Sequence, residues 1–437
     1  MLNLEYNINY IFDMFKYKKT ILKNKIPLIL VPMVGVKTAT ALIMIKTGSK
    51  YENRSESGLS HFLEHMFFKG TKRRPDTLTL SAELDVLGGE YNAFTSKEYT
   101  GYFVKVAEGK LSQALDILGD MLTASKFEAE EIEREKGVII EELNMYEDNP
   151  LMHIEDVLET CLYGDTPAGW DTIGTKKNIQ SFKRADFLRY FNRQYGAKSI
   201  KVILSGAIKE TDQKQARQIF ENIKTNNWQD KMAVKEEQTK PVLKSVFKAT
   251  DQVNLSLAVR AVPVGHPQEL ALKMLSVILG GSMSSRLFIS LRERSGLAYY
   301  VKTSTEFYSD SGYLTTQAGV PKDKAAAAVE IILAEYRRIA NEDVAPEELA
   351  RAKDLMSGKL LMQLETSDDV ASWYGRQTIL RDKFIEPAEL NKRLRALTAK
   401  DIRQAAELVM KDWNLNLAII GPIKEAGKQK LLKMLKI

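Results

Sequence analysis

Three residues of one short segment have the types and the spacing of a metal-dependent hydrolytic site. In the segment 58–71 (GLSHFLEHMFFKGT), His61 and His65 are four positions apart and Glu64 precedes the second histidine. On a helix, both imidazoles would project from one face and could hold one metal ion. Glu64 would lie beside that pair, where a carboxylate can accept a proton from metal-bound water. With four histidines in the whole chain, chance gives this pattern on the order of a few times per thousand such chains.

A third protein ligand is expected, because a catalytic zinc usually takes three and leaves the fourth position for water. The segment Ala129–Tyr146 is predicted to be a helix, and it is rich in carboxylates. Glu135 and Glu142 are seven positions apart and therefore lie on one face, with apolar residues between them. A carboxylate on a buried face is costly unless it is paired or binds a metal. Glu141 is rotated by about 100° from its neighbour and should point elsewhere.

These segments resemble a known enzyme family. HFLEH followed by EREKGVIIEE is similar to the pitrilysin-type inverted zincins, zinc metallopeptidases that include insulin-degrading enzyme and the mitochondrial processing peptidase. The resemblance implies that His61, His65 and Glu142 bind Zn²⁺, one ion per chain. It also implies that Glu64 is the general base, which takes a proton from the zinc-activated water and delivers it to the leaving amine.

The same resemblance concerns two further glutamates of the second segment. The glutamate that supports the zinc site in the family falls on Glu135. Glu141 is the competing candidate for the third ligand, and Glu142 is preferred because the motif aligns on it without a gap.

Two other segments are similar to the family's substrate-binding elements. NAFT resembles an edge strand that binds peptides by main-chain hydrogen bonds, which is recognition by β-strand addition. Its residues are Asn92, Ala93, Phe94 and Thr95. LRERSGLAYYV is similar to the family's arginine–tyrosine element, which places Arg292 and Tyr299 against the scissile carbonyl as it becomes an oxyanion. Taken alone, these residues would be interpreted as ordinary strand, surface and core positions.

The elements around these residues predict an α+β fold made of two homologous domains. The repeated elements are strands at 26–32 and 39–46 before the histidine helix, and strands at 242–248 and 253–262 before a helix at 269–279. A polar stretch at 225–240 separates the two halves. We therefore expect an N-terminal catalytic domain at 1–232 and a C-terminal domain at 233–437 that closes the substrate cleft. The resemblance implies that each is an antiparallel sheet with helices on one face.

The composition excludes several other classes of protein. A net charge of +6 over 437 residues is small for a nucleic-acid-binding protein, and the basic run at 69–74 is interpreted as a solvated loop. The longest apolar stretches are far shorter than the roughly 20 residues that span a membrane. Residues 1–19 lack the features of a signal or transit peptide. A single cysteine, Cys161, excludes an internal disulfide. A cytoplasmic protein without nucleic-acid or membrane partners is expected.

The predicted function is that of a zinc metalloendopeptidase acting on unfolded peptides or small polypeptides. The chain resembles the short, two-domain subgroup, whose members commonly pair to enclose a chamber. Because one chain carries both the zinc set and the arginine–tyrosine element, a homodimer is expected. Two alternatives remain: a non-catalytic scaffold or assembly subunit of the same fold, and a processing peptidase for one specific precursor.

Overall fold

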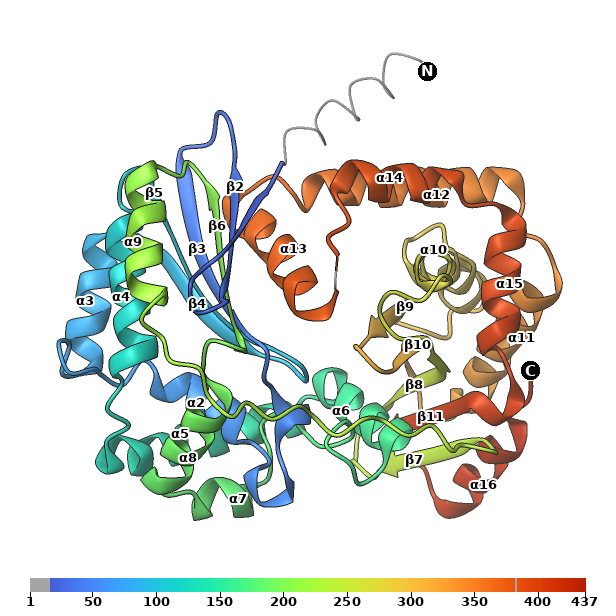
Figure 1. Cartoon of the computed structure of the whole chain (residues 1–437). Helices are drawn as coiled ribbons and strands as arrows, with labels where there is room; N and C mark the ends of the chain where they lie inside the picture. Colours follow the sequence, from blue (N-terminus) through green and yellow to red (C-terminus); the bar gives the residue numbers. More distant parts are fainter. Residues whose placement is uncertain (1–15, 382) are drawn as a thin grey trace. The chain divides into compact units, whose positions relative to one another are not determined.

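The computed structural model describes residues 16–381 and 383–437, and these divide into two compact units (Figure 1). The first unit contains the described residues up to Leu143, then 171–232 and 360–391. The second unit contains 144–170, 233–359 and 392–437. The expected domain boundary between residues 232 and 233 coincides with one of the boundaries between the two units. The units nevertheless exchange two segments, because 144–170 belongs to the second unit and 360–391 belongs to the first. Most of the segment 1–19 considered above lies outside the described residues.

The first unit is built on a six-stranded sheet with the order β1-β2-β6-β3-β5-β4. Its strands are β1 (Lys18–Ile21), β2 (Pro27–Pro32), β3 (Thr38–Ile45), β4 (Glu90–Thr95), β5 (Thr100–Ala107) and β6 (Ile200–Gly206). All neighbours are antiparallel except β2 and β6, which are parallel. β3 reads TATALIMI and is buried along nearly its whole length. A continuous apolar strand of this kind is typical of a sheet that is covered on both faces.

Helices cover both faces of this sheet. α4 packs on β3 and β5 and against α9, while α13 packs on β3 and β6 (Figure 1). The helices of the first unit are α2 (Leu59–Met66), α3 (Thr77–Val86), α4 (Leu111–Ala124), α5 (Ala129–Asp148, up to Leu143), α7 (Lys176–Ser181), α8 (Arg184–Gln194), α9 (Glu210–Phe220) and α13 (Ser367–Leu380). Val370, Ala371 and Tyr374 of α13 form a buried cluster with Ile29 and Leu42 of the sheet. The expectation of helices on one face of the sheet is therefore incomplete.

The second unit repeats this plan with a five-stranded sheet of the order β7-β11-β8-β10-β9. Its strands are β7 (Val242–Val246), β8 (Gln252–Ala261), β9 (Tyr300–Phe307), β10 (Gly312–Pro321) and β11 (Leu415–Ile420). Its helices include α6 (Pro150–Tyr163), α10 (Glu269–Gly280), α11 (Ala325–Asn341), α15 (Ala399–Val409) and α16 (Glu425–Met434). α10 and α11 pack on β8, β9 and β10, and α6 packs on β7, β8 and β11. Two further helices, α12 (Pro346–Met362) and α14 (Pro387–Ala396), contain division points between the units.

The two sheets have the same topology, and this confirms the predicted α+β fold with two related domains. β2, β6, β3, β5 and β4 correspond in order to β7, β11, β8, β10 and β9, and the first pair is parallel in both sheets. Two helices pack on the sheet that the other half of the sequence forms. α6, which follows α5 in the first half, covers the second sheet, and α13, which follows α12 in the second half, covers the first sheet. In the part of the chain that the structure describes, no helix is both long and apolar enough to cross a membrane.

Candidate metal centre

The two histidines of the HFLEH segment lie on α2, a helix of eight residues. Phe62, Leu63 and Met66 are fully buried, so the apolar positions fix which face of α2 the fold covers. Phe62 packs edge-on against Phe187 at 4.8 Å between ring centroids. His61 and His65 share another face, with their ring centroids 4.7 Å apart. α2 ends at Met66, directly after His65.

Glu142 of α5 meets both imidazoles. Its Oε1 lies 3.6 Å from Nε2 of His61, and its Oε2 lies 3.5 Å from Nε2 of His65. One donor atom from each of the three residues lies within 4.8 Å of the other two. Among the described residues, no other group of three histidine, cysteine or acidic side chains converges in this way. The close approach of His61, together with the nearby imidazole of His65, holds the pKa of Glu142 below its usual value.

The donor set fits a single zinc ion. Two imidazole nitrogens and one carboxylate form the His₂Glu combination of several catalytic zinc sites. At a Zn–N distance of about 2.0–2.1 Å, tetrahedral ligands lie about 3.4 Å apart, which is close to the two separations from Glu142. Nδ1 of His65 bonds the carboxylate of Glu135, and in the neutral imidazole a proton on Nδ1 leaves the lone pair of Nε2, which lies 3.5 Å from Glu142, for a metal ion. His61, His65 and Glu142 would therefore hold the ion.

Glu135 lies two helical turns before Glu142 on α5 and supports the position of His65. It is 4% exposed, and its Oε1 accepts a hydrogen bond of 2.9 Å from Nδ1 of His65. Its other oxygen forms an ion pair of 2.5 Å with Nζ of Lys69. Burial alone would raise the pKa of Glu135, but the bonds from His65 and Lys69 bring it below its usual value. Lys69 is a supporting residue that the sequence reasoning missed. It lies beyond the end of α2 and contacts a residue of α5, so no spacing within one helix could have indicated the contact.

Glu64 lies beside the three donor residues without belonging to them. It is 9% exposed, and burial raises its pKa above the usual value of a glutamate. A hydrogen bond of 2.5 Å from Oγ1 of Thr95 to its Oε2, together with the nearby imidazoles, opposes that rise. A buried carboxylate next to a metal site is suited to accept a proton and to return it.

Glu141 and Glu142 face different ways on α5. Glu141 is exposed and does not belong to the three-residue group, whereas Glu142 is half-buried and does. The rotation of about 100° between neighbouring helical residues accounts for this difference. The geometry favours Glu142 as the third ligand.

The four residues Asn92–Thr95 lie on β4, the outermost strand of the first sheet. β4 pairs with β5 on one side, and none of the described strands pairs with its other side. The N–H group of Ala93 bonds Oδ1 of Asn92 at 2.8 Å rather than the neighbouring strand. Phe94 lies across Gly101 on β5, where a Cβ atom would come within 2.2 Å of the ring. The outer edge of β4 thus offers main-chain groups, and Thr95 connects this strand to Glu64.

Arg292 and Tyr299 belong to the second unit. Arg292 lies in the π-helical turn η3 (Phe288–Arg294), with its guanidinium 5.0 Å from the ring centroid of Phe288. Tyr299 directly precedes β9 and is 77% exposed. Its neighbour Tyr300 donates a hydrogen bond of 2.9 Å to Asn254 and is partly buried. Tyr299 is therefore the more accessible of the two tyrosines, and the role of both Arg292 and Tyr299 at the metal centre stays a prediction.

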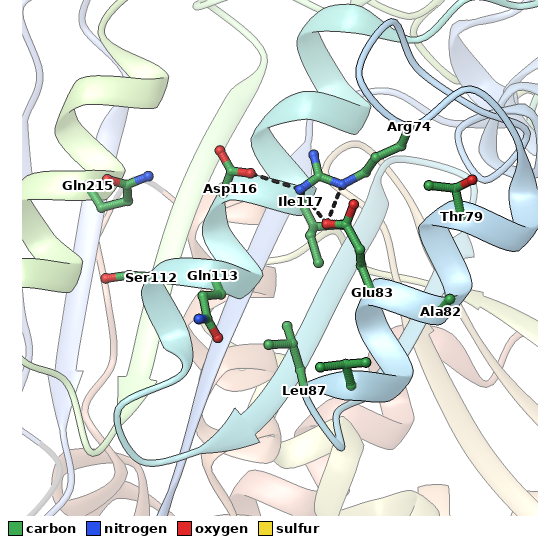
Figure 2. A pocket seen from close by; sticks show the side chains of 11 residues that line it. Arg74, Thr79, Ala82, Glu83, Leu87, Ser112, Gln113, Asp116, Ile117 and Gln215 are labelled. Atoms are coloured by element: carbon green, nitrogen blue, oxygen red, sulfur yellow. Dashed lines mark hydrogen bonds and ion pairs between the residues drawn. The ribbon is translucent and has the colours of Figure 1, made fainter.

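The basic run at 69–74 is a solvated loop only in part, because Lys72 and Arg73 are exposed whereas Arg74 is buried. Arg74 is 6% exposed and forms ion pairs with Asp116, Asp120 and Glu83 at 2.7 to 2.9 Å. Arg74, Glu83 and Asp116 line one side of a hollow of about 690 Å³ between α3 and α4 (Figure 2). The wall includes Leu87, and no group of three potential metal ligands lies there. Composition alone could not show that the carboxylates of α4 would pair with this loop.

The fold and the donor set together describe a two-domain α+β protein in which His61, His65 and Glu142 form a candidate His₂Glu metal site. Comparisons with known proteins agree with this description. Residues 31–176 match the family described as insulinase (peptidase family M16), and residues 181–356 match the peptidase M16 inactive domain. The chain belongs to the M16 peptidase family, whose short, two-domain members it resembles.

Named relatives cover nearly the whole chain. It is 32% identical over 406 residues to the uncharacterized zinc protease YmxG of Bacillus subtilis, across 93% of this chain and 98% of that protein. It is 29% identical over 403 residues to the mitochondrial-processing peptidase subunit beta of Mus musculus, across 89% and 81%. A solved structure of a protease from Helicobacter pylori has the same fold, with a TM-score of 0.86 at 23% identity over 93% and 99% of the two chains.

Proposed function

We propose that this chain is a zinc metalloendopeptidase that hydrolyses unfolded peptides or small polypeptides with one zinc ion per chain. The observation that carries the proposal is the convergence of His61, His65 and Glu142 beside the buried carboxylate of Glu64. Membership of a peptidase family and the names of the relatives support it.

Each residue of the site has a separate role in the proposed peptide hydrolysis. When bound, zinc would supply Lewis acidity, which polarises a peptide carbonyl and lowers the pKa of a coordinated water. Glu64 takes a proton from the attacking water and returns it to the leaving amine. Thr95 holds Oε2 of Glu64 by a hydrogen bond, so the other carboxylate oxygen is left for the proton. Glu135 and Lys69 fix the tautomer and the orientation of His65.

Substrate recognition is assigned to the outer edge of β4 and to two residues of the second unit. An extended peptide would add to the edge strand through main-chain bonds, which would allow cleavage of unrelated sequences. Arg292 and Tyr299 are proposed to hold the scissile carbonyl as it gains negative charge. The proposal for these two rests on the resemblance to the family rather than on their geometry.

Two alternatives differ from this function in measurable ways. A non-catalytic scaffold subunit would not need the metal donors, so the complete set of three ligands and Glu64 argues against it. A processing peptidase would cut one precursor, as the name of the mouse relative suggests for that protein. We favour broad peptide hydrolysis because the edge strand offers main-chain groups that any extended peptide can pair with.

The assembly and the compartment are also proposals. A homodimer is proposed because one chain carries both the donor set and the arginine–tyrosine element. A cytoplasmic location is proposed because the chain has a single cysteine, Cys161, which is a buried free thiol.

The proposed function is tested by a library of quenched-fluorescent peptides with the wild type and with Glu64→Gln. The wild type should cleave many unrelated peptides. The variant should bind zinc as the wild type does and lose about 10²–10⁴-fold in kcat, because it lacks the proton acceptor. Glu130→Gln, an exposed position on α5, serves as the control and should cleave normally. A wild type that binds no zinc and cleaves nothing would favour the scaffold, and cleavage of a single precursor would favour the processing peptidase.

A further inference from the structure

The helix that carries both histidines cannot cap its own N-terminus. α2 begins at Leu59, after Gly58, whose φ is +98°. Helix starts leave main-chain N–H groups that need acceptors, and a Ser, Thr, Asp or Asn side chain usually supplies one. Gly58 has no side chain, and a Cβ atom there would lie 2.3 Å from the carbonyl oxygen of Ile173. The fold therefore excludes a local capping residue at this position.

Glu52, six residues before Gly58, supplies the missing acceptors. Its Oε2 accepts a hydrogen bond of 2.8 Å from the N–H group of Gly58, and its Oε1 accepts one of 2.5 Å from the N–H group of Ser60. The side chain is 3% exposed. Ser60 directly precedes the ligand His61, so this carboxyl group is bonded to the main chain one residue away from the metal site.

The segment that carries Glu52 is itself fixed to the turn after β4. The N–H group of Ser49 bonds the carbonyl of Ser96 at 3.2 Å, and the N–H group of Lys50 bonds the carbonyl of Lys97 at 2.9 Å. A Cβ atom on Gly48 would lie 2.1 Å from the same carbonyl of Ser96. Because Ser96 follows Thr95, this segment connects the strand that contacts Glu64 to the first turn of α2.

The burial of Glu52 is unfavourable in itself. Burial raises the pKa of Glu52 to about 8, although the N–H groups of Ser60 and Gly58 oppose the rise. A buried polar group is retained at low cost only where its hydrogen bonds are made. An apolar residue in this place would avoid the burial cost and leave the first turn of α2 without acceptors.

We propose that Glu52 is a positioning residue of the metal site, because its carboxyl group fixes the first turn of α2 and thereby the place of His61 opposite Glu142. This inference rests on the proposed function, since it concerns the same metal ion. It differs from a purely stabilising role in one respect: loss of the carboxyl group should change the geometry of the bound metal, beyond lowering the stability of the fold.

The test replaces Glu52 by Gln, which keeps the shape of the side chain and turns one acceptor into a donor. Glu56→Gln is the matched control, because Glu56 is equally buried at 3% and pairs with Arg193 of α8. Zinc affinity is measured by competition with a chelator, and the visible spectrum of the cobalt-substituted protein reports the geometry of the ligands. Thermal unfolding of the metal-free proteins is measured in parallel.

For Glu52→Gln we expect zinc affinity to fall by about 10- to 100-fold, with displaced cobalt absorption bands. For Glu56→Gln we expect the wild-type spectrum and wild-type zinc affinity, even where the melting temperature falls. If Glu52→Gln does not fold, Glu52→Asp keeps both acceptor oxygens on a side chain one methylene shorter and should give a smaller change of the same kind. The inference is wrong if the foldable Glu52 variant has the wild-type spectrum and affinity, or if the control changes both equally. A wild type that binds neither metal would instead overturn the proposed function.

Discussion

At the scale of single residues, the site consists of a donor set and a smaller group of residues that hold it. Helical spacing alone indicates His61 and His65 as donors, with Glu64 beside them. The choice of Glu142 as the third donor depends on the resemblance to the family. The supporting contacts could not be predicted in the same way. The hydrogen bond from Thr95 to Glu64 and those to Glu52 join residues of different elements, and only the folded chain brings them together.

The pKa of Glu64 gives a prediction at this scale. Burial raises that pKa, and the hydrogen bond from Thr95 lowers it. Glu64 must be ionised to accept a proton, so activity should be lost as the pH falls through its pKa. Thr95→Val removes the bond, and the acid limb of the kcat/KM profile should move to higher pH by about one unit. Thr95→Ser keeps the hydroxyl group and should leave the limb in place. An unchanged limb in the valine variant would show that this bond does not tune the general base.

At the scale of elements, the sequence predicts where several strands lie along the chain, but it does not predict which helices pack on which sheet. The predicted strands at 26–32 and 39–46 correspond to β2 and β3, and the predicted edge strand at 92–95 lies within β4. Periodicity cannot show which helix covers a sheet face when more than 300 residues separate them, as with α13 and β3. The continuous apolar run of β3 was the one available signal that both faces are covered.

The outer edge of β4 gives a prediction about substrate binding. The N–H group of Ala93 bonds Asn92 and is not used in pairing with β5. Ala93→Pro should remove one main-chain donor to the peptide without breaking the sheet, because proline is tolerated on edge strands. KM should rise about two- to tenfold, the equivalent of one hydrogen bond, and zinc content should not change. Ala93→Val keeps the donor and serves as the control. If the proline variant binds peptides normally, the edge of β4 does not align the substrate through this group.

At the scale of the whole molecule, the exchange of segments makes the two halves of the sequence depend on each other for folding. α13 from the second half completes the core of the first unit, and α6 from the first half covers the sheet of the second. A continuous division at residue 232 follows the repeat in the sequence. It does not follow the packing, because α6 from the first half lies on the second sheet and α13 from the second half lies on the first sheet.

This exchange predicts that residues 1–232 do not fold on their own. Without α13, one face of the first sheet would expose Ile29, Leu42 and their neighbours, a large apolar surface. The fragment should bind a hydrophobic dye and unfold without a cooperative transition. A variant in which residues 360–391 are joined to residue 232 by a flexible linker should bind less dye. Cooperative unfolding of the plain fragment at the temperature of the full chain would contradict the assignment of α13 to this unit.

The central claim is that His61, His65 and Glu142 hold one zinc ion on which peptide hydrolysis depends. The most direct measurement is the zinc content and the peptidase activity of two neighbouring variants, Glu142→Gln and Glu141→Gln. The account predicts that Glu142→Gln loses both zinc and activity. Glu141→Gln, which changes an exposed residue, should keep about one zinc ion per chain and near-normal activity. Zinc retained by the Glu142 variant, or lost by the Glu141 variant, would contradict the assigned ligand set.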